Sequence, residues 1–226
     1  MQLLQVKNLH WRRTGGFTID VKDFTAKRGQ LISIIGRNGS GKTTFIEILA
    51  GLHPKVRDKI MLLDKKLDDN LLPMRKHIGY IPDDSDWFIY ELTGKEYIDV
   101  LAETFSKAKT SSPELKQNAK NLCQELGFEM LDTPIVQLSH GNKRKLQIVA
   151  GLMHKPDVVL LDELHNGLDA ITMPKVDAIL RRYIKEGTCV IASTHNFSWA
   201  KKMSTSVAFM KAGRLSQAMQ LRARNV

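Results

Sequence analysis

Short apolar runs separated by helical stretches organise most of the chain. Continuous apolar or β-branched runs at residues 31–35, 158–161 and 189–192 are typical of strands that are buried on both faces of a sheet. Helical patterns follow two of these runs, and we expect helices at residues 43–50 and 176–185. Strands that alternate with helices in this way favour parallel βαβ units, so the pattern predicts an α/β fold.

The N-terminal part of the chain has a different pattern. Residues 3–6 and 17–21 are rich in apolar or β-branched side chains, and the pair at residues 15–16 is Gly-Gly, which marks a turn. Two further short strands are expected at residues 60–63 and 78–81, the second of which is stopped by a proline. This region is therefore predicted to consist of strands with little helix.

The middle of the chain is predicted to be helical. Two apolar stripes at three- and four-residue spacing are separated by a polar break at residues 107–113: Tyr97, Ile98, Leu101 and Phe105 in the first, and Leu115, Ala119, Leu122 and Leu126 in the second, which Gly127 ends. Core packing accounts for both stripes. With a third helix at about residues 141–154, these segments form a helical subdomain over about residues 92–154, inserted between two parts of one α/β core, residues 1–91 and 155–226.

Composition narrows the class of protein. The 226 residues, 42% of them hydrophobic, are enough for one substantial core, and no apolar run approaches the roughly 20 residues of a membrane span. Only Cys123 and Cys189 are present and the first residues resemble no secretory leader, so a reducing cytoplasm is expected. The net charge is +10, but the basic residues are scattered and no aromatic-interleaved basic repeat occurs. Nucleic acid is therefore not expected as a partner.

Residues 36–44 fill the phosphate-loop pattern G-x-x-x-x-G-K-[ST] between a predicted strand and a predicted helix. In that context backbone N–H groups and the helix dipole converge on a phosphate. Lys42 is expected to reach the β- and γ-phosphates, and Thr43 to offer its hydroxyl to Mg²⁺. The pattern predicts a nucleoside triphosphate site with these loop residues: Gly36, Asn38, Gly39, Ser40, Gly41, Lys42, Thr43 and Thr44.

Polar residues at the ends of later strands are candidates for the other half of this site. Asp162 and Glu163 follow an apolar strand, where Asp162 is expected to hold Mg²⁺ and Glu163 to orient or deprotonate a water. His195 follows the next strand and is a candidate contact for the γ-phosphate. Ser139 and Gly141 begin a helix and form a second anion site, which makes sense if it serves the nucleotide of another subunit.

In this order the motifs resemble those of an ATP-binding cassette (ABC) ATPase subunit over essentially the whole chain. The family signature LSGGQ, which most phosphate-loop proteins lack, is similar to residues 138–142, with His140 for its first glycine and Asn142 for its glutamine. The remaining matches are the Walker A loop at 36–44, Walker B with the catalytic glutamate at 160–163, the D-loop at 166–169, the switch histidine at His195 and a late hairpin at 211–215.

The resemblance implies a P-loop NTPase core with a mostly parallel sheet, an N-terminal antiparallel β subdomain and an inserted α-helical subdomain. It also implies a head-to-tail dimer, homo- or heteromeric, that holds ATP and Mg²⁺ between a Walker A loop and the partner's signature. Ser139, Gly141 and Asp169 would serve that interface, and Lys42, Glu163 and His195 would be catalytic. Such a subunit powers transport through separate transmembrane permease subunits at the cytoplasmic face of the membrane.

This sequence departs from the family pattern at Asp83 and at residues 164–165, and one further position is not fixed. Residues 79–82 are followed by Asp83 where the family usually has Gln, although an aspartate still binds Mg²⁺ or water. Residues 164–165 are Leu-His where Pro-Thr or Pro-Ser is usual. The aromatic residue that stacks on adenine is expected early in the chain, where Trp11 and Phe17 are the candidates and Trp11 is preferred.

The direction of transport and two other functions stay open. Residues 90–97 and the Ser-His-Gly signature variant resemble the exporter branch of the family, so export is expected. The basic balance instead suits a soluble ABC-type ATPase that acts on nucleic acid, ribosomes or cluster assembly. Asp83 and the variant signature suit a regulatory subunit that binds ATP but hydrolyses it weakly.

Overall fold

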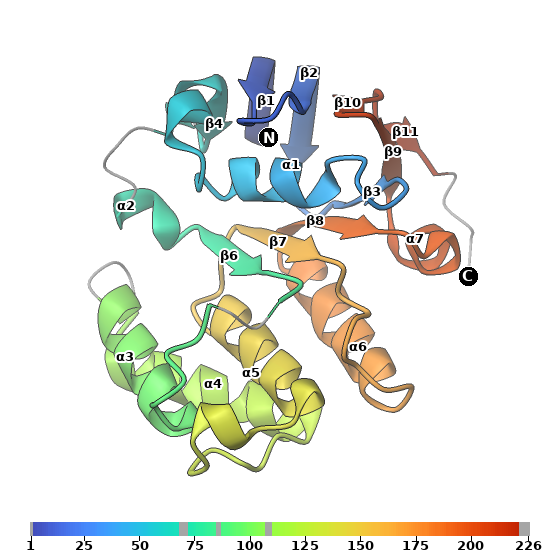
Figure 1. Ribbon diagram of the computed structural model, residues 1–226. Coiled ribbons are helices and arrows are strands. Elements are labelled where there is room, and N and C mark those ends of the chain that lie inside the picture. The colour runs from blue at the N-terminus through green and yellow to red at the C-terminus, as the bar shows by residue number, and fades with distance from the viewer. Residues whose placement is uncertain (1, 68–71, 85–86, 107–109, 222–226) are drawn as a thin grey trace.

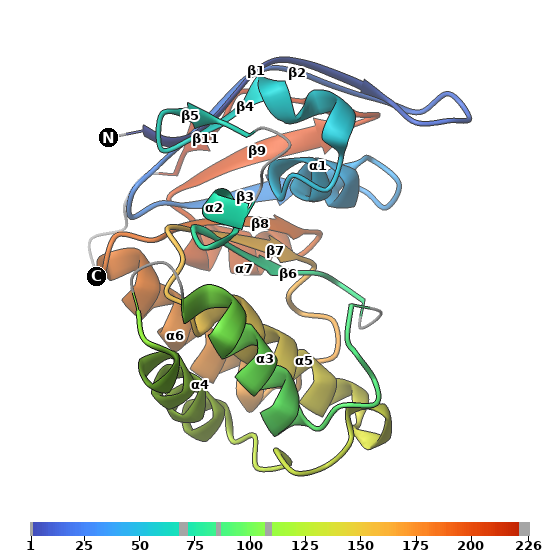
Figure 2. The same ribbon diagram turned by 90° about the vertical axis from the view of Figure 1, so that its left-hand side faces the viewer.

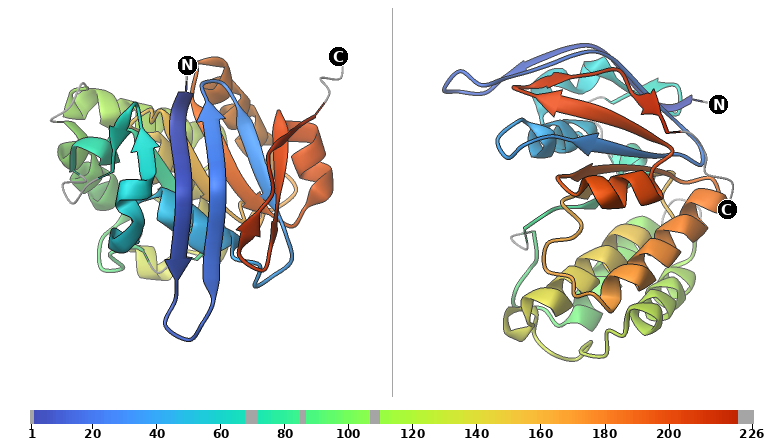
Figure 3. Two further views of the ribbon diagram at one scale, coloured as in Figure 1. Left: turned by 90° about the horizontal axis from the view of Figure 1, so that it is seen from above. Right: turned by 90° about the vertical axis from the view of Figure 1, so that its right-hand side faces the viewer.

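One large twisted sheet runs through the molecule, with helices on its faces (Figures 1–3). The computed structural model describes residues 2–67, 72–84, 87–106 and 110–221. Among these residues the strand order is β5-β4-β1-β2-β10-β9-β3-β8-β7-β6, and β11 pairs separately with β9. The two ends of this order are an antiparallel region formed mainly by the N-terminal strands and a parallel region that carries the apolar runs.

The parallel region consists of β3 (Leu31–Ile35), β6 (Ile78–Ile81), β7 (Val158–Asp162), β8 (Cys189–Thr194) and β9 (Ser206–Lys211). Each of its neighbouring pairs is parallel. Every residue of β3, β7 and β8 is buried, as expected for strands that are covered on both faces. The predicted fold class, an α/β P-loop core with a mostly parallel sheet, is confirmed.

The antiparallel region is built on a long hairpin of β1 (Gln2–Arg12) and β2 (Thr18–Lys27). Both strands are longer than the sequence predicted. Along them buried residues alternate with polar residues that face water, and this alternation weakens the apolar signal. The remaining short strands of the sheet are β4 (Ile60–Leu62), β5 (Lys65–Lys66), β10 (Arg214–Leu215) and β11 (Met219–Gln220).

A cluster of helices lies below the parallel strands in Figures 1 and 2. Three of them, α3 (Gly94–Ser106), α4 (Ser112–Leu126) and α5 (His140–Leu152), come between β6 and β7 in the chain, with the short η2 (Ile135–Gln137) before α5. Helix α4 ends at Gly127, whose φ of +65° is the left-handed conformation that glycine adopts readily. Part of the predicted polar break, residues 107–109, lies outside the described residues.

The other helices pack on the core. Helix α1 (Lys42–Leu49) lies between the β1–β2 hairpin and the parallel strands, where Phe45 meets Phe24 edge-on. Helix α6 (Thr172–Lys185) begins four residues before the predicted position, and α7 (Phe197–Met203) was not predicted. The short helices η1 (Pro54–Lys59) and α2 (Leu72–Arg75) complete the set in the described residues.

Both cysteines of the chain lie in the interior. Cys123 of α4 and Cys189 of β8 are both free and buried, and burial raises the pKa of their thiols, to about 11 and about 12 respectively. No helix among the described residues has the length and apolarity needed to cross a lipid bilayer.

Candidate nucleotide-binding site

The loop between β3 and α1 is shaped for a phosphate by its glycines. Gly36 lies so close to the Met210 carbonyl and the Ser40 hydroxyl that a Cβ there would collide with both. Gly41 has a φ of +106°, and a Cβ on it would lie 2.6 Å from a methyl group of Ile19. These two glycines therefore let the loop pack closely against β9 and β2, and the N-terminus of α1 adds partial positive charge at the loop.

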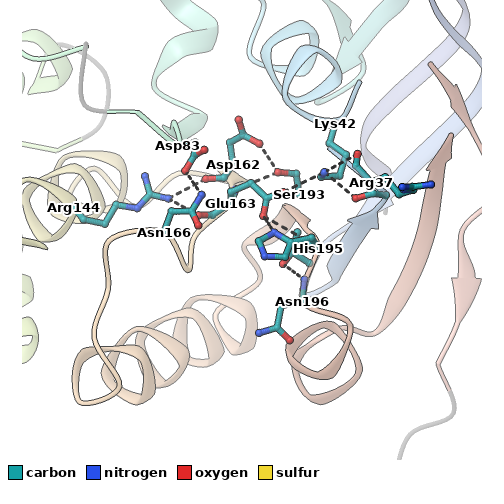
Figure 4. Close-up of polar contacts among 12 residues, drawn as sticks. Arg37, Lys42, Asp83, Arg144, Asp162, Glu163, Asn166, Ser193, His195 and Asn196 are labelled. Atoms are coloured by element: carbon teal, nitrogen blue, oxygen red, sulfur yellow. Dashed lines mark hydrogen bonds and ion pairs between the residues drawn. The ribbon is translucent and has the colours of Figure 1, made fainter. Parts of the chain in front are cut away.

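Lys42 is the first residue of α1, and its ammonium group turns back over the loop. Its side chain is only 6% exposed, and Nζ donates to the Gly36 carbonyl at 3.0 Å. The same Nζ lies 3.2 Å from Oε1 of Glu163. The loop lysine and the predicted catalytic glutamate, 121 residues apart in the numbering, thus meet as a buried ion pair (Figure 4).

His195 contacts the same glutamate from the other side. Oε2 of Glu163 lies 2.9 Å from Nδ1 of His195 and accepts from its backbone N–H at 3.3 Å. The contact follows from the topology, because β7 and β8 are parallel neighbours and both residues come just after their strands. Glu163 also has a φ of +43°, uncommon for a residue with a side chain, which turns the chain sharply after β7. Lys42, Glu163 and His195 therefore form one cluster.

The predicted metal ligands face each other at the ends of β6 and β7. Burial is the main cause that raises the pKa of Asp162, and the nearby charges of Asp83 and Glu163 add to it. Hydrogen bonds from the hydroxyls of Ser193 and Thr43 oppose that shift. Crowded carboxylates beside a hydroxyl are the hard oxygen donors that Mg²⁺ prefers, so the residues present fit the ion.

The donor set on its own is incomplete. Within the described part of the chain, no group of three or more His, Cys, Asp or Glu side chains is arranged to hold a metal. Mg²⁺ in nucleotide sites characteristically uses one or two carboxylates and takes other ligands from phosphates and water. The arrangement around Thr43 and Asp162 thus suits an ion that arrives with its nucleotide.

A cavity of about 570 Å³ lies between the phosphate loop and the polar residues at the strand ends. Its lining comes from the loop, from the strand ends and from the β1–β2 turn: Arg13, Phe17, Asn38, Gly39, Gly41, Lys42, Thr43, Thr44, Asp83, Glu163, Asn166 and His195. Such a volume lies within the usual range for small-molecule sites. The cavity and the polar cluster coincide.

The aromatic residue at this cavity differs from the one that the sequence favoured. Phe17 lines the cavity, and its ring would lie 3.0 Å from a Cβ on Gly41. Trp11 instead packs edge-on against His53, with ring centroids 4.8 Å apart. Which face of the hairpin each ring occupies depends on the register of β1 and β2, which the sequence pattern does not give.

The predicted signature residues lie elsewhere. Ser139 caps α5, and its hydroxyl accepts from the backbone N–H of Asn142 at 3.3 Å, as predicted. Neither Ser139 nor Gly141 is among the described residues that line the cavity. Asp169 accepts from the N–H of Thr172, the first residue of α6, at 2.6 Å, and this bond lowers the pKa of its exposed carboxyl. Within one chain these three residues are separate from the phosphate loop.

Three residues of the site were not among the predicted site residues. Ser193 donates to Asp162, and Asn166 donates to Oδ1 of Asp83 at 2.7 Å. Arg144 of α5 is buried and donates to the backbone carbonyls of Asp162 and Glu163 (Figure 4). The placement of Ser193 next to His195 was a usable signal. Nothing in the pattern of α5 separates Arg144 from its basic neighbours.

The fold and the site together define a phosphate-loop ATPase domain. A family model described as "ABC transporter" matches residues 19–166, which is more than half of the chain. The chain belongs to the ABC transporter family, and it is an ATP-binding, nucleotide-hydrolysing domain of that family. The match includes the phosphate loop, the residue after 79–82, the signature segment and the strand that ends in Asp162.

Individual relatives agree with this assignment. A putative ABC transporter ATP-binding protein of Archaeoglobus fulgidus is 33% identical over 78% of this chain and 72% of its own length. The human ATP-binding cassette sub-family A member 13 is 32% identical over 84% of this chain but only 4% of its own length. The energy-coupling factor transporter ATP-binding protein EcfA of Carboxydothermus hydrogenoformans is 28% identical over 89% of this chain and 74% of its own length.

Solved structures share the whole architecture. An ATP-binding subunit of an ABC transporter superposes with a TM-score of 0.86 at 27% identity, covering 97% of this chain and 90% of that one. The cbiO1 protein of Clostridium perfringens, part of an ABC transporter complex, gives a TM-score of 0.78 at 26% identity, with coverage of 97% and 88%. The predicted ABC ATPase fold is confirmed by these likenesses.

Proposed function

We propose that this chain binds and hydrolyses ATP to power transport through separate permease subunits at the cytoplasmic face of a membrane. The observation that carries the proposal is the convergence of Lys42, Glu163 and His195 at a phosphate loop. Family membership supports the ATPase part, and relatives named as transporter subunits support the coupling to transport.

Each residue of the cluster has a definite task in hydrolysis. The loop N–H groups and Lys42 bind the β- and γ-phosphates, and Thr43, Asp162 and Asp83 are the residues that would hold Mg²⁺. When bound, the ion neutralises charge that develops on the phosphate oxygens. Oε1 or Oε2 of Glu163 accepts the proton of the attacking water, and His195 holds the carboxylate in place from one side.

The second anion site completes the proposal with a second subunit. Ser139 and Gly141 at the N-terminus of α5, together with Asp169, would contact the nucleotide that the partner's phosphate loop holds. This arrangement explains why a serine-capped helix start lies apart from the loop in one chain. The partner is a second ABC ATPase subunit of the same or of a related sequence.

Two subdomains and the groove between them suit contact with a permease. Residues 1–91 and 155–226 act as the ATPase core, and about 92–154 as the helical subdomain. A mainly apolar groove of about 340 Å³ lies between them, lined by Met74, Tyr80, Trp87, Tyr97, Leu101 and other side chains. Trp87 and Ile89 nearby are each 50% exposed. We assign this groove to a short amphipathic cytoplasmic helix of the permease, whose acidic residues would meet Arg75 at the rim.

Export is the proposed direction, on the basis of residues 90–97 and the Ser-His-Gly variant of the signature. An import function is the competing candidate, because a putative HMP/thiamine import ATP-binding protein of Bacillus subtilis is 28% identical over 91% of this chain. Reconstituted vesicles with the co-purified permease test the direction. Substrate that accumulates on the side away from the ATPase supports export, and net movement toward it supports import.

The test of the ATPase proposal is phosphate release by the purified full chain with its permease. The Glu163→Gln variant keeps the shape of the side chain but removes the base, so it should bind ATP and hydrolyse it at least a hundredfold more slowly. It should also accumulate an ATP-bound dimer in size-exclusion chromatography. Wild-type rates equal to those of Glu163→Gln would favour the weakly hydrolytic regulatory subunit instead.

A further inference from the structure

Arg144 is a buried cation whose hydrogen bonds to the described residues all go to neutral acceptors. The residue is 1% exposed and lies in α5, one turn after Ser139. Its Nη2 donates to the carbonyls of Asp162 at 2.9 Å and Glu163 at 3.2 Å, and Nη1 donates to the carbonyl of Pro82 (Figure 4). Burying a charge in this way is costly, so a simple packing role explains the residue poorly.

The carbonyls that Arg144 binds belong to two of the acids at the site and to the residue before the third. Pro82 directly precedes Asp83, and the other two carbonyls are those of Asp162 and Glu163 themselves. The pairing of β6 with β7 ends at Ile81 and Leu161, so the ladder supplies no donors beyond that point. The planar, forked guanidinium group of Arg144 bridges the ends of β6 and β7 at that point.

Gln147, one turn later in α5, orients this fork. Its Oε1 accepts from Nη1 of Arg144 at 3.0 Å, while its Nε2 donates to the carbonyl of Asp84. Both turns of α5 thus hold the segment around Asp83. Burial lowers the pKa of Arg144, and the charges of Asp83 and Asp162 oppose that shift, so the guanidinium remains a cation.

We propose that Arg144 is a positioning residue that couples α5 to the catalytic and metal-binding acids, setting the separation between Asp83 and the Asp162–Glu163 pair. The inference rests on the proposed function of this site. Because the N-terminus of α5 carries Ser139, movement of that helix is transmitted to the three acids through Arg144, with Gln147 as its support. Arg144 touches no nucleotide in this proposal and acts through the backbone.

The experiment compares Arg144→Lys and Arg144→Gln with the matched control Lys145→Gln, in purified full-length protein. Lys145 is the next residue of α5, has the same charge and donates to the Gly127 carbonyl away from the site. Three quantities are measured: the thermal unfolding midpoint, the affinity for a fluorescent ATP analogue with and without Mg²⁺, and kcat for ATP hydrolysis.

We expect both Arg144 variants to bind the analogue without Mg²⁺ within about twofold of wild type. The gain in affinity on adding Mg²⁺ and kcat should each fall by about tenfold or more, as for other residues that orient metal ligands. Arg144→Lys, which keeps the charge but not the fork, should recover only part of the loss. Lys145→Gln should match wild type in all three measurements.

Folded Arg144 variants that match Lys145→Gln in Mg²⁺ response and kcat would overturn the inference. Variants that lose affinity equally with and without Mg²⁺ would also overturn it, because they point to general destabilisation. If neither variant folds, Gln147→Leu decides, with a smaller loss of the same kind expected and no loss counting against the inference. A wild-type chain that binds Mg²⁺-nucleotide without hydrolysing it contradicts the proposed function alone, since the Mg²⁺ response still tests Arg144.

Discussion

The buried pair of Lys42 and Glu163 determines how the phosphate loop responds to substitution. Lys42 is paired with Glu163 in a nearly buried position, so its ammonium is held in place for a phosphate and also compensates the glutamate charge. Loss of Lys42 leaves the Glu163 carboxylate in contact with His195 but without its buried cation. The effects of a Lys42 substitution therefore extend beyond a single lost contact.

The Lys42→Ala variant should lose most of its affinity for ATP. A charge-assisted hydrogen bond of this kind contributes about 1.5–3 kcal/mol, and Glu163, without the compensating charge of Lys42, would further repel the phosphates. Isothermal titration calorimetry with ATP and Mg²⁺ measures the change. Lys120→Ala, an exposed position on α4, is the control and should bind as wild type. Equal affinities in both variants would contradict the phosphate role of Lys42.

Substitutions of Phe17 and Trp11 test which of the two aromatic rings contributes to ATP binding. Phe17→Ala should weaken ATP binding by about 1–2 kcal/mol if the adenine base stacks on the ring, which lines the cavity. Trp11→Ala should mainly lower the unfolding midpoint, since it removes the contact with His53. Titration of both variants with ATP separates the two residues. A larger affinity loss for Trp11→Ala would restore the original sequence prediction.

Some residues of the site could be predicted from the sequence and others could not. The loop at 36–44 was predictable because each of its constraints, from tight glycines to a lysine at a helix start, is local. The sequence placed Glu163 and His195 at the ends of two strands, but their contact became evident only from the pairing of β7 with β8. Arg144 and the ring orientation of Phe17 were not predictable, because burial of a charge and hairpin register depend on contacts distant in the chain.

Among the elements, α5 and the loop before α6 are packed closely at their ends. The ring of His140, the residue that replaces a signature glycine, lies directly over Gly167 and leaves no room for a Cβ there. Gly167 also has a φ of +79°, which strains any residue with a side chain. The start of α5 therefore depends on a glycine in the neighbouring loop.

Gly167→Ala should destabilise the protein by about 1–3 kcal/mol, since it combines an unfavourable φ with a clash against His140. The double variant Gly167→Ala/His140→Ala should regain the part due to the clash, whereas His140→Ala alone should be nearly neutral because the ring is exposed. Urea unfolding of the four proteins gives the coupling energy. Simple additivity would exclude the proposed contact.

At the scale of the whole molecule, one ion-pair cluster ties the antiparallel region to the parallel region. Asp157, just before β7, accepts from Arg28 at 2.8 Å and lies 2.7 Å from Nδ1 of His77. Arg28 follows β2, while His77 precedes β6, so the cluster spans three segments. It lies at the amino ends of the parallel strands, opposite the nucleotide site at their carboxyl ends.

The stability supplied by Asp157 should depend on pH. Burial raises the pKa of this carboxyl, but the hydrogen bonds and charges of His77 and Arg28 outweigh it and lower the pKa below 3.8. The contribution is therefore complete above pH 3.8 and is lost as the pH falls through the lower folded-state value. Asp157→Asn should cost about 1 kcal/mol at pH 7, with screening by solvent taken into account.

Urea unfolding at pH 7 and at steps below pH 4 checks this dependence. The gap between wild type and Asp157→Asn should close as the pH falls, while Asp132→Asn, an exposed carboxylate of the loop before η2, should show no comparable gap at pH 7. A gap that stays constant into strong acid would mean that the charge of Asp157 does not stabilise the fold.

The two buried cysteines should leave the native protein nearly unreactive toward thiol reagents. At neutral pH both thiols stay protonated inside the core, so maleimides and similar reagents have almost no nucleophile to attack in the native state. A fluorophore attached to one new surface cysteine, for example at Lys120, would then be the sole label without any prior removal of natural thiols. Distances between subunits during the ATP cycle become measurable in an otherwise unaltered chain.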